Sequence, residues 1–169
     1  MGPVISPEHR DKIEKYMKVA KDDGATIAIG GKRPDDEDLK DGLFFEPTVI
    51  TNCDTHMRIV QEEVFGPVVT VEGFDNEEEA IALANDSIYG LAGAVFSKDI
   101  GKAQRVANKL KLGTVWINDF HPYFAQAPWG GYKQSGIGRE LGKEGLEEYL
   151  ISKHILTNRN PEPVNFFSK

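Results

Sequence analysis

The stretch that decides the fold runs from Thr114 to Glu140 and reads TVWINDFHPYFAQAPWGGYKQSGIGRE. Its first residues, Thr114 to Ile117, are apolar or β-branched and predict a buried strand. An aromatic loop follows, and a turn broken by glycines then leads into a predicted helix. Because most loops are short and polar, a loop this long and this aromatic favours a functional role.

Ring-bearing side chains dominate this loop, and no positive charge accompanies them. The rings belong to Phe120, His121, Tyr123, Phe124 and Trp129. No Lys or Arg lies between positions 112 and 131. Rings gathered at the end of a strand suit an apolar or cationic small ligand better than nucleic acid. Core packing of the same rings is the alternative, and the residues alone leave both interpretations open.

The composition is typical of one globular domain with its own core, since the chain has 169 residues. Its net charge of −7 opposes nonspecific binding to nucleic acid, which requires a basic surface. There is no run of about eighteen apolar residues, so we expect no membrane span. The N-terminus lacks the apolar core of a signal peptide. The single cysteine, Cys53, excludes an internal disulfide and favours a reducing compartment, the cytoplasm.

The first part of the chain predicts one helix and two short strands. Ser6 supplies a capping hydroxyl before a proline at the first helical position, and apolar residues recur at helical spacing until Gly24. We expect strands at 25–29 and 44–51. A proline inside the second of these, Pro47, predicts a sheet edge or an extended arm.

A regular alternation of strands and helices begins after residue 67. Strands are predicted at 68–74, 91–96 and 113–117. The first intervening helix has a capping-box-like start at Asn76, and we expect Ser97 to cap the second. This order implies a parallel sheet with right-handed crossovers. Ligands in such sheets bind beyond the carboxyl ends of the strands, which is where the aromatic loop begins.

The last part of the chain predicts a helix at 138–150 and an alternating strand, ISKHILT, at 151–157. No later segment is available to pair with this strand. It must therefore join an earlier strand, pack on the body of the domain or reach another chain.

A second dense stretch, QEEVFGP at 61–67, places Glu63 two residues before Phe65. A carboxylate can accept hydrogen bonds from both hydroxyls of a ribose, and a ring beside it can support a nicotinamide. Surface acids next to a core phenylalanine are the alternative. The stretch alone does not decide between the two.

Other candidate chemistry is weaker. Asp54 beside Cys53 raises the pKa expected for the thiol, so an inert cysteine is the default. The four histidines are far apart and share no ligand spacing with the cysteine, which argues against zinc. The glycines at 136–138 open a helix and could bind an anion, but they lack the pattern of a dinucleotide motif. The residues thus predict an α/β domain with an aromatic pocket and no evident nucleophile.

At these stretches the sequence resembles the NAD(P)-dependent aldehyde dehydrogenases. The motifs that carry the resemblance follow one another in the family order, and they are QEEVFGPVV, NDSIYGLAGAVFS, GTVWIN and APWGGYKQSGIGRELGKEGLEEYL. Within the superfamily, DFHPYFAQAPWGG looks most like the bacterial betaine aldehyde dehydrogenases. The resemblance covers essentially the whole chain.

The resemblance implies that the chain is a C-terminal portion of an enzyme about three times as long. Residues 1–149 would be the C-terminal, parallel-sheet part of the catalytic domain, and 150–169 an oligomerisation strand and tail. The Rossmann-type domain, the catalytic cysteine and the general base would lie upstream of Met1. The chain alone would then be inactive.

The resemblance also implies roles for single residues. Glu63 would hold the hydroxyls of the nicotinamide ribose, Phe65 would contact the nicotinamide, and Glu140 matches a buried glutamate that relays protons. Lys133 and Gly136 match the region of a monovalent-cation site, for K⁺, between subunits. Four residues would line the aldehyde pocket, namely Phe120, His121, Tyr123 and Trp129.

The function implied is oxidation of betaine aldehyde to glycine betaine, an osmoprotectant, with NAD or NADP as the cofactor. Aromatic faces attract the trimethylammonium group of this substrate, which cannot donate a hydrogen bond. The subunits would form a dimer or tetramer through the C-terminal strand. Two alternatives stay open: a catalytically inert truncated chain that binds other subunits, and a dehydrogenase for another aldehyde.

Overall fold

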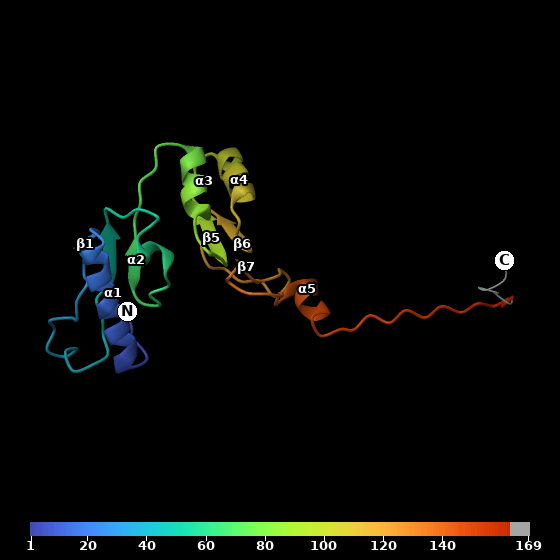
Figure 1. Cartoon of the computed structure of the whole chain (residues 1–169), viewed down its shortest axis with the longest axis horizontal. Helices are drawn as coiled ribbons and strands as arrows, with labels where there is room; N and C mark the ends of the chain where they lie inside the picture. The colour runs from blue at the N-terminus through green and yellow to red at the C-terminus, as the bar shows by residue number, and fades with distance from the viewer. Residues whose placement is uncertain (163–169) are drawn as a thin grey trace, which may run out of the picture.

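The computed structural model describes residues 1–162 and arranges them as two lobes followed by an extended segment (Figure 1). The first lobe contains α1 and α2 with a small sheet, and the second contains α3 and α4 beside β5 and β6. The segment after β3 links the two lobes. Within residues 1–162, no helix combines the length and the apolar character that crossing a membrane requires.

The first lobe is built on α1 (Pro7–Asp22), whose start was predicted from its capping residues. The Ser6 hydroxyl accepts a hydrogen bond from the His9 backbone N–H at 3.2 Å, which satisfies one of the free donors at the helix N-terminus. The helix turns Ile13 and Met17 into the core of the lobe, where they pack with Ile50. Ile13 and Ile50 are fully buried, so the predicted helical stripe is confirmed.

The sheet of this lobe has the order β1-β2-β3, with β1 (Thr26–Ile29) antiparallel and β3 (Val68–Thr70) parallel to the central β2 (Thr48–Thr51). The prediction of a sheet edge at Pro47 is therefore wrong. The strand begins one residue after the proline, and the Thr48 N–H donates to the Pro67 carbonyl at 2.8 Å. The missing N–H of the proline thus falls outside the ladder.

The second lobe contains the predicted parallel pair. β5 (Ala92–Val95) and β6 (Thr114–Ile117) pair from Ala92 opposite Thr114 to Val95 opposite Ile117, with α4 (Ile100–Lys109) as the crossover. α3 (Glu77–Asn85) lies beside α4 (Figure 1). The prediction that the strand after residue 67 joins this sheet is wrong, because β3 pairs with β2 in the other lobe.

The helix caps of the second lobe follow the sequence with one exception. The Asn76 side chain accepts from the Glu79 N–H at 2.9 Å, as predicted for the start of α3. On α4 the cap is Asp99, which accepts from the Lys102 N–H at 3.0 Å, and not Ser97. The Ser97 hydroxyl instead accepts from the Asp99 N–H at 3.1 Å, so it supports the cap from outside the helix.

Three short elements complete the lobes: α2 (Arg58–Gln61), and the antiparallel pair of β4 (Tyr89–Gly90) and β7 (Tyr132–Lys133). The last helix, α5 (Gly142–Glu147), is shorter than the predicted 138–150. Leu141 and Gly142 have φ values of 61° and 60°, which are incompatible with a helix that starts earlier.

Residues 151–162 form no strand, so the strand predicted at 151–157 is absent from the described chain. The segment runs away from the second lobe and is exposed along its length (Figure 1). Its apolar side chains are exposed by 97% at Ile151, 77% at Ile155 and 83% at Leu156. A strand needs a partner for its backbone groups, and residues 1–162 offer none here. The rest of the predicted tail, 163–169, lies outside the described residues.

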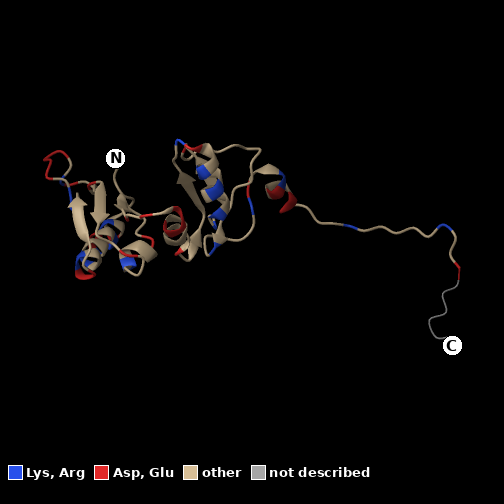
Figure 2. Ribbon diagram, turned by 90° about the horizontal axis from the view of Figure 1, so that it is seen from above, with Lys and Arg blue, Asp and Glu red and all other residues tan. Residues whose placement is uncertain are grey.

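Charged residues are distributed unevenly over the described chain (Figure 2). Basic residues gather along α4, which carries Lys102, Arg105 and Lys109. Arg105 donates to Glu77 on α3 at 3.1 Å, so part of this positive charge is already paired. The whole chain keeps its net charge of −7.

Candidate functional site

A cluster of aromatic rings forms at the carboxyl end of β6, around the indole of Trp116. This side chain is 9% exposed and lies at the centre of the cluster. Ring centroids around it lie 5.5 to 6.2 Å away and belong to Phe120, His121, Tyr123 and Trp129. The prediction that rings gather at this strand end is confirmed for these four residues and not for Phe124. We call the four residues, together with Trp116, the ring cluster.

Hydrogen bonds fold the loop back over Trp116. The Trp116 indole N–H donates to the Pro122 carbonyl at 3.1 Å, which fixes the middle of the loop to the strand. The Tyr123 hydroxyl and His121 Nε2 lie 3.1 Å apart. His121 itself has a φ of 76°, and this left-handed conformation lets the chain reverse after Phe120.

The start of the loop is anchored to the neighbouring strand. The Asn118 side chain accepts from the Ser97 N–H and donates to the Ser97 carbonyl, both at 2.8 Å. Ser97 lies two residues after the end of β5, so this pair joins the carboxyl ends of both parallel strands. The loop thus begins at a fixed point, in the place where open α/β sheets bind their ligands.

The outer rings of the cluster have free faces. Phe120 is 63% exposed and Tyr123 is 48% exposed. Tyr123 also meets Trp129 edge to face, at 4.7 Å between centroids. Exposed rings supported from behind by a buried indole form a ready surface for an apolar or cationic group. Phe124, 62% exposed, has no ring partner among the described residues.

Sequence reasoning assigned Trp116 to the strand and missed its place in the site. The available signal was its position, because it lies two residues before the loop leaves the strand. A ring at that point can be reached by any side chain that folds back over the strand end.

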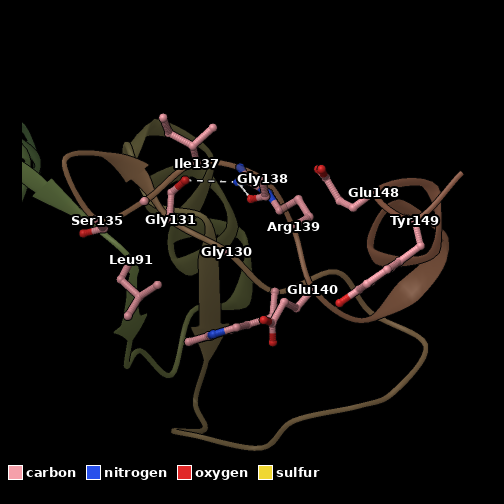
Figure 3. Close-up of a pocket in the computed structure, with 12 residues that line it drawn as sticks. Leu91, Gly130, Gly131, Ser135, Ile137, Gly138, Arg139, Glu140, Glu148 and Tyr149 are labelled. Atoms are coloured by element: carbon pink, nitrogen blue, oxygen red, sulfur yellow. Dashed lines mark hydrogen bonds between the residues drawn. The ribbon is translucent and has the colours of Figure 1, made fainter. Parts of the chain in front are cut away.

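A cavity of about 410 Å³ borders the cluster at Trp129 and extends past the glycine turn at 136–138 toward α5 (Figure 3). Arg139 crosses this region and donates to the carbonyls of Gly131 at 3.1 Å and Gly138 at 2.7 Å. Its positive charge is therefore engaged with backbone oxygens, next to the ring of Tyr132 at 5.5 Å.

Glu140 lies in the wall of the same cavity (Figure 3). Its backbone pairs with that of Trp129 in an antiparallel bridge, with N···O distances of 2.7 and 2.6 Å. The bridge holds the two residues opposite each other. The resemblance implies a buried glutamate, whereas Glu140 is exposed in this chain because nothing in residues 1–162 covers it. The expected burial concerns the whole enzyme, and the burial and role of Glu140 there stay predictions.

The residues expected to contact the cofactor lie on the loop between α2 and β3. Glu63 is exposed and lines a second cavity, of about 540 Å³. This cavity shares Leu91 and Ser135 with the one beside Trp129, so Glu63 and the ring cluster face adjoining spaces. Phe65 lines neither cavity and is 70% exposed, with its ring 6.0 Å from that of His9.

The two residues expected near a monovalent cation take different positions. The Lys133 ammonium donates to the carbonyls of Asn85 and Ser87, both at 2.9 Å, at the C-terminal end of α3. A cation there complements the helix dipole. The ammonium itself cannot ligate a metal ion, so only the backbone oxygen of Lys133 could. Gly136 lines the cavity of about 410 Å³. The described chain contains no group of three His, Cys, Asp or Glu residues arranged to hold a metal.

Cys53 behaves as the sequence predicts. Burial raises the pKa of its thiol, and the nearby carboxylates of Glu72 and Asp54 raise it further. A nucleophilic cysteine needs the opposite shift. Cys53 packs against the core of the first lobe, and its sulfur lies 3.6 Å from the Thr51 carbonyl.

The comparison with known families agrees with this architecture. A family described as the aldehyde dehydrogenase family matches residues 1–155. The chain belongs to the aldehyde dehydrogenase family.

Two of the relatives that the chain resembles are named for betaine aldehyde and for aminoaldehydes. It is 66% identical to betaine aldehyde dehydrogenase of Bacillus subtilis (strain 168), over 99% of this chain and 34% of that protein. It is 51% identical to the peroxisomal aminoaldehyde dehydrogenase 2 of Pisum sativum, over 99% of this chain and 33% of that protein. The chain therefore spans about a third of the length of these relatives.

A solved structure shows the same fold. The crystal structure of betaine aldehyde dehydrogenase from Staphylococcus aureus in complex with NAD⁺ is 89% identical, with a TM-score of 0.96. The match covers 100% of this chain and 34% of that chain. The arrangement of the two lobes is thus that of one segment of the larger enzyme.

Proposed function

We propose that this chain is a segment of an NAD-dependent dehydrogenase that oxidises betaine aldehyde to glycine betaine. The observation that carries the proposal is the ring cluster: five rings at one strand end, with no Lys or Arg between positions 112 and 131. The 89% identity to an enzyme of that name from Staphylococcus aureus, solved with NAD⁺, supports both the substrate and the cofactor.

The chemistry of the substrate explains why rings suit it. A trimethylammonium group has no N–H, so it cannot be recognised by an ordinary N–H hydrogen bond. The faces of aromatic rings attract it electrostatically, by about 0.5–2 kcal/mol for a good contact. The free faces of Phe120 and Tyr123 and the ring of Trp129 would receive the cationic end, and His121 would hold Tyr123 in place. A lysine or arginine here would repel the substrate.

The residues on the cofactor side fit a nicotinamide ribose. Glu63 presents an exposed carboxylate to an open cavity that adjoins the one beside Trp129, and a carboxylate can accept both ribose hydroxyls. Phe65 would support the nicotinamide ring. When bound, NAD⁺ supplies the hydride acceptor for aldehyde oxidation. The thiol nucleophile and general base would come from the part of the enzyme outside this chain, since Cys53 has a raised pKa.

The decisive test uses the intact subunit that contains this segment. We expect formation of NADH with betaine aldehyde, and kcat/KM at least about 10-fold above that for an uncharged aldehyde of similar length, given the free energy of one cation–π contact. A higher kcat/KM for an ω-aminoaldehyde would support the alternative substrate, which the name of the Pisum sativum relative suggests. No NADH with either substrate would refute both.

Replacing Glu63 by glutamine should raise the KM for NAD⁺ about 10-fold, because hydrogen bonds to a charged acceptor contribute roughly 1.5–3 kcal/mol. The amide keeps the size of the side chain and loses its charge. The measurement is steady-state kinetics with NAD⁺ varied, alongside a stopped-flow record of hydride transfer. Wild-type values for both would refute the assignment of Glu63.

Glu140 is proposed as a proton relay between the bulk solvent and the general base. In the intact subunit, Glu140→Gln should slow release of the acid about 10-fold or shift the pH dependence of kcat, since proton transfer by a positioned group contributes at least about 100-fold in many enzymes and a relay contributes part of that. Glu144→Gln on the exposed face of α5 serves as a control. A wild-type profile in Glu140→Gln would count against the relay.

The exposed C-terminal segment supports a second proposal, that residues 150–169 join subunits into a dimer or tetramer. The apolar side chains of Ile151, Ile155 and Leu156 are exposed to solvent along a backbone that pairs with no other strand in residues 1–162. Exposed apolar side chains on an unpaired backbone are typical of a surface that binds another chain. If the chain is a truncated product, it would bind intact subunits without catalysing the reaction. Co-elution with them supports this role, and separate elution refutes it.

Residues 1–149 would form the C-terminal part of the catalytic domain. The backbone oxygens of Lys133 and Gly136 would contribute to a K⁺ site between subunits. A cytoplasmic location is proposed from the single, half-buried thiol.

A further inference from the structure

Three side chains along one face of α1 contact the loop that carries Glu63 and Phe65. We call residues 62–66 the cofactor loop. His9, Lys12 and Tyr16 are spaced three and four residues apart, so they lie along one side of the helix. His9 Nε2 lies 2.5 Å from the Phe65 carbonyl, and Lys12 Nζ donates to the Glu63 carbonyl at 3.1 Å.

The third of these contacts reaches a side chain. The Tyr16 hydroxyl donates to the carboxylate of Glu62 at 2.8 Å, across 46 positions of sequence. Arg58 of α2 binds the same carboxylate through two nitrogens, both at 2.9 Å. Bonds from Arg58 and then Tyr16 lower the pKa of Glu62 to about 2, so the carboxylate stays ionised at any working pH. The start of the loop is thus tied to two helices at once.

The other end of the loop, at Gly66, packs closely against Ile13 of α1. Ile13, which lies between Lys12 and Tyr16 on α1, is fully buried. A Cβ added at Gly66 would lie 2.7 Å from Ile13 Cδ1. The chain can therefore pass this close to the helix only because position 66 has no side chain.

The backbone of the cofactor loop needs this support. Phe65 has a φ of 57°, a left-handed conformation that costs a non-glycine residue free energy and persists only where surrounding contacts fix it. A carbonyl can only accept, so His9 must donate from Nε2 to the carbonyl of that same strained residue. The bond from His9 therefore acts at the point where the loop would otherwise relax.

We propose that His9 and Tyr16 are positioning residues, which hold the cofactor loop in the strained conformation that presents Glu63 and Phe65 to the nicotinamide half of the cofactor. This inference rests on the proposed function. Neither residue needs to touch the cofactor. His9 acts through the backbone of Phe65, and Tyr16 acts through the carboxylate of Glu62.

The test uses single substitutions in the intact enzyme. Tyr16→Phe removes one hydroxyl and should raise the KM for NAD⁺ about 3–10-fold and slow single-turnover hydride transfer, with the KM for betaine aldehyde unchanged. His9→Ala should act in the same direction. His9→Gln should restore most of the loss, because its amide can donate to the Phe65 carbonyl. Lys15→Ala, an exposed residue of α1 outside these contacts, is the control.

A second measurement separates positioning from general destabilisation. Amide hydrogen exchange in a peptide that covers residues 62–66 should rise in Tyr16→Phe and His9→Ala, while exchange in β5 and β6 stays at the wild-type rate. Wild-type cofactor KM and wild-type exchange in both variants would overturn the inference. If Glu63→Gln also leaves the cofactor KM unchanged, the assignment of Glu63 fails as well; if Glu63→Gln raises it, only the positioning role fails. Absence of NADH formation by the wild-type enzyme would instead refute the proposed function.

Discussion

Replacing Gly113 by alanine should lower the melting temperature of the 169-residue chain by about 6–12 °C. A clash that the backbone must absorb costs about 3 kcal/mol, the upper end of the usual range for overpacking, and a chain of this size loses about 2–4 °C per kcal/mol. Gly113 lies immediately before β6, against the end of the aromatic loop. A Cβ there would overlap the carbonyl oxygen of Gly130 and lie 2.8 Å from its carbonyl carbon.

Neither the backbone at Gly113 nor that at Gly130 can move easily to relieve this clash. The Gly113 N–H donates to the Gly90 carbonyl at 3.1 Å, and the next N–H, of Thr114, donates to Leu91 at 3.2 Å, so the strand is held in its sheet. Gly130 is held by its neighbour Trp129, which pairs with Glu140. The strain must therefore displace the loop, and in the intact enzyme Gly113→Ala should also reduce activity with betaine aldehyde.

The matched control is Gly73→Ala, in the segment that links the two lobes. A Cβ at Gly73 meets nothing within 4 Å, and its φ lies outside the left-handed region. Circular dichroism melts of both variants isolate the effect of the close approach from the general effect of adding a methyl group. Equal melting temperatures for the two variants would contradict the packing described at Gly113.

Short sequence patterns predicted the helices and strands that are stabilised by contacts between residues near each other in the sequence. The capping residues Ser6 and Asn76 mark the true starts of α1 and α3, since each accepts the backbone N–H that its helix leaves free. The alternation of strands and helices also predicted the parallel pair of β5 and β6, because a short crossover places successive strands side by side.

Contacts between distant parts of the chain could not be predicted in the same way. β3 has the pattern of a strand, yet nothing in its residues indicates that it pairs with β2 and not with β5. The prediction of a C-terminal strand fails for a related reason. Apolar and polar residues alternate in ISKHILT, but a strand forms only where a partner strand is available. The start of α5 depends on the positive φ of Leu141, just before the helix, which no local pattern in the sequence indicates.

The candidate site shows the same division. Its outer rings, including Tyr123 and Trp129, were found from composition alone, because a loop seldom carries so many. The central indole of Trp116 was missed, since a tryptophan in an apolar strand is usually a core residue. Its role depends on the fold of the loop, through the bond from its N–H to Pro122.

Replacing Trp129 by alanine in the intact enzyme should raise the KM for betaine aldehyde about 10–30-fold, since a desolvated cation–π contact is worth up to about 2 kcal/mol. The KM for an uncharged aliphatic aldehyde should change less than about 3-fold, because that substrate loses only apolar contact. The ring centroid of Trp129 lies 4.7 Å from that of Tyr123 and 6.1 Å from that of Trp116. Removing this ring therefore opens the cluster where the cationic end of the substrate would lie.

The control is Trp129→Phe, which keeps a ring face and should retain most of the selectivity for the charged substrate. Steady-state kinetics with both aldehydes, at saturating NAD⁺, give the ratio that matters. If Trp129→Ala weakens both substrates equally, Trp129 shapes the pocket without recognising the charge, and the cation–π argument fails. Preserved selectivity in Trp129→Phe together with its loss in Trp129→Ala leaves the ring face as the cause, because the uncharged aldehyde reports the effect of the lost apolar volume separately.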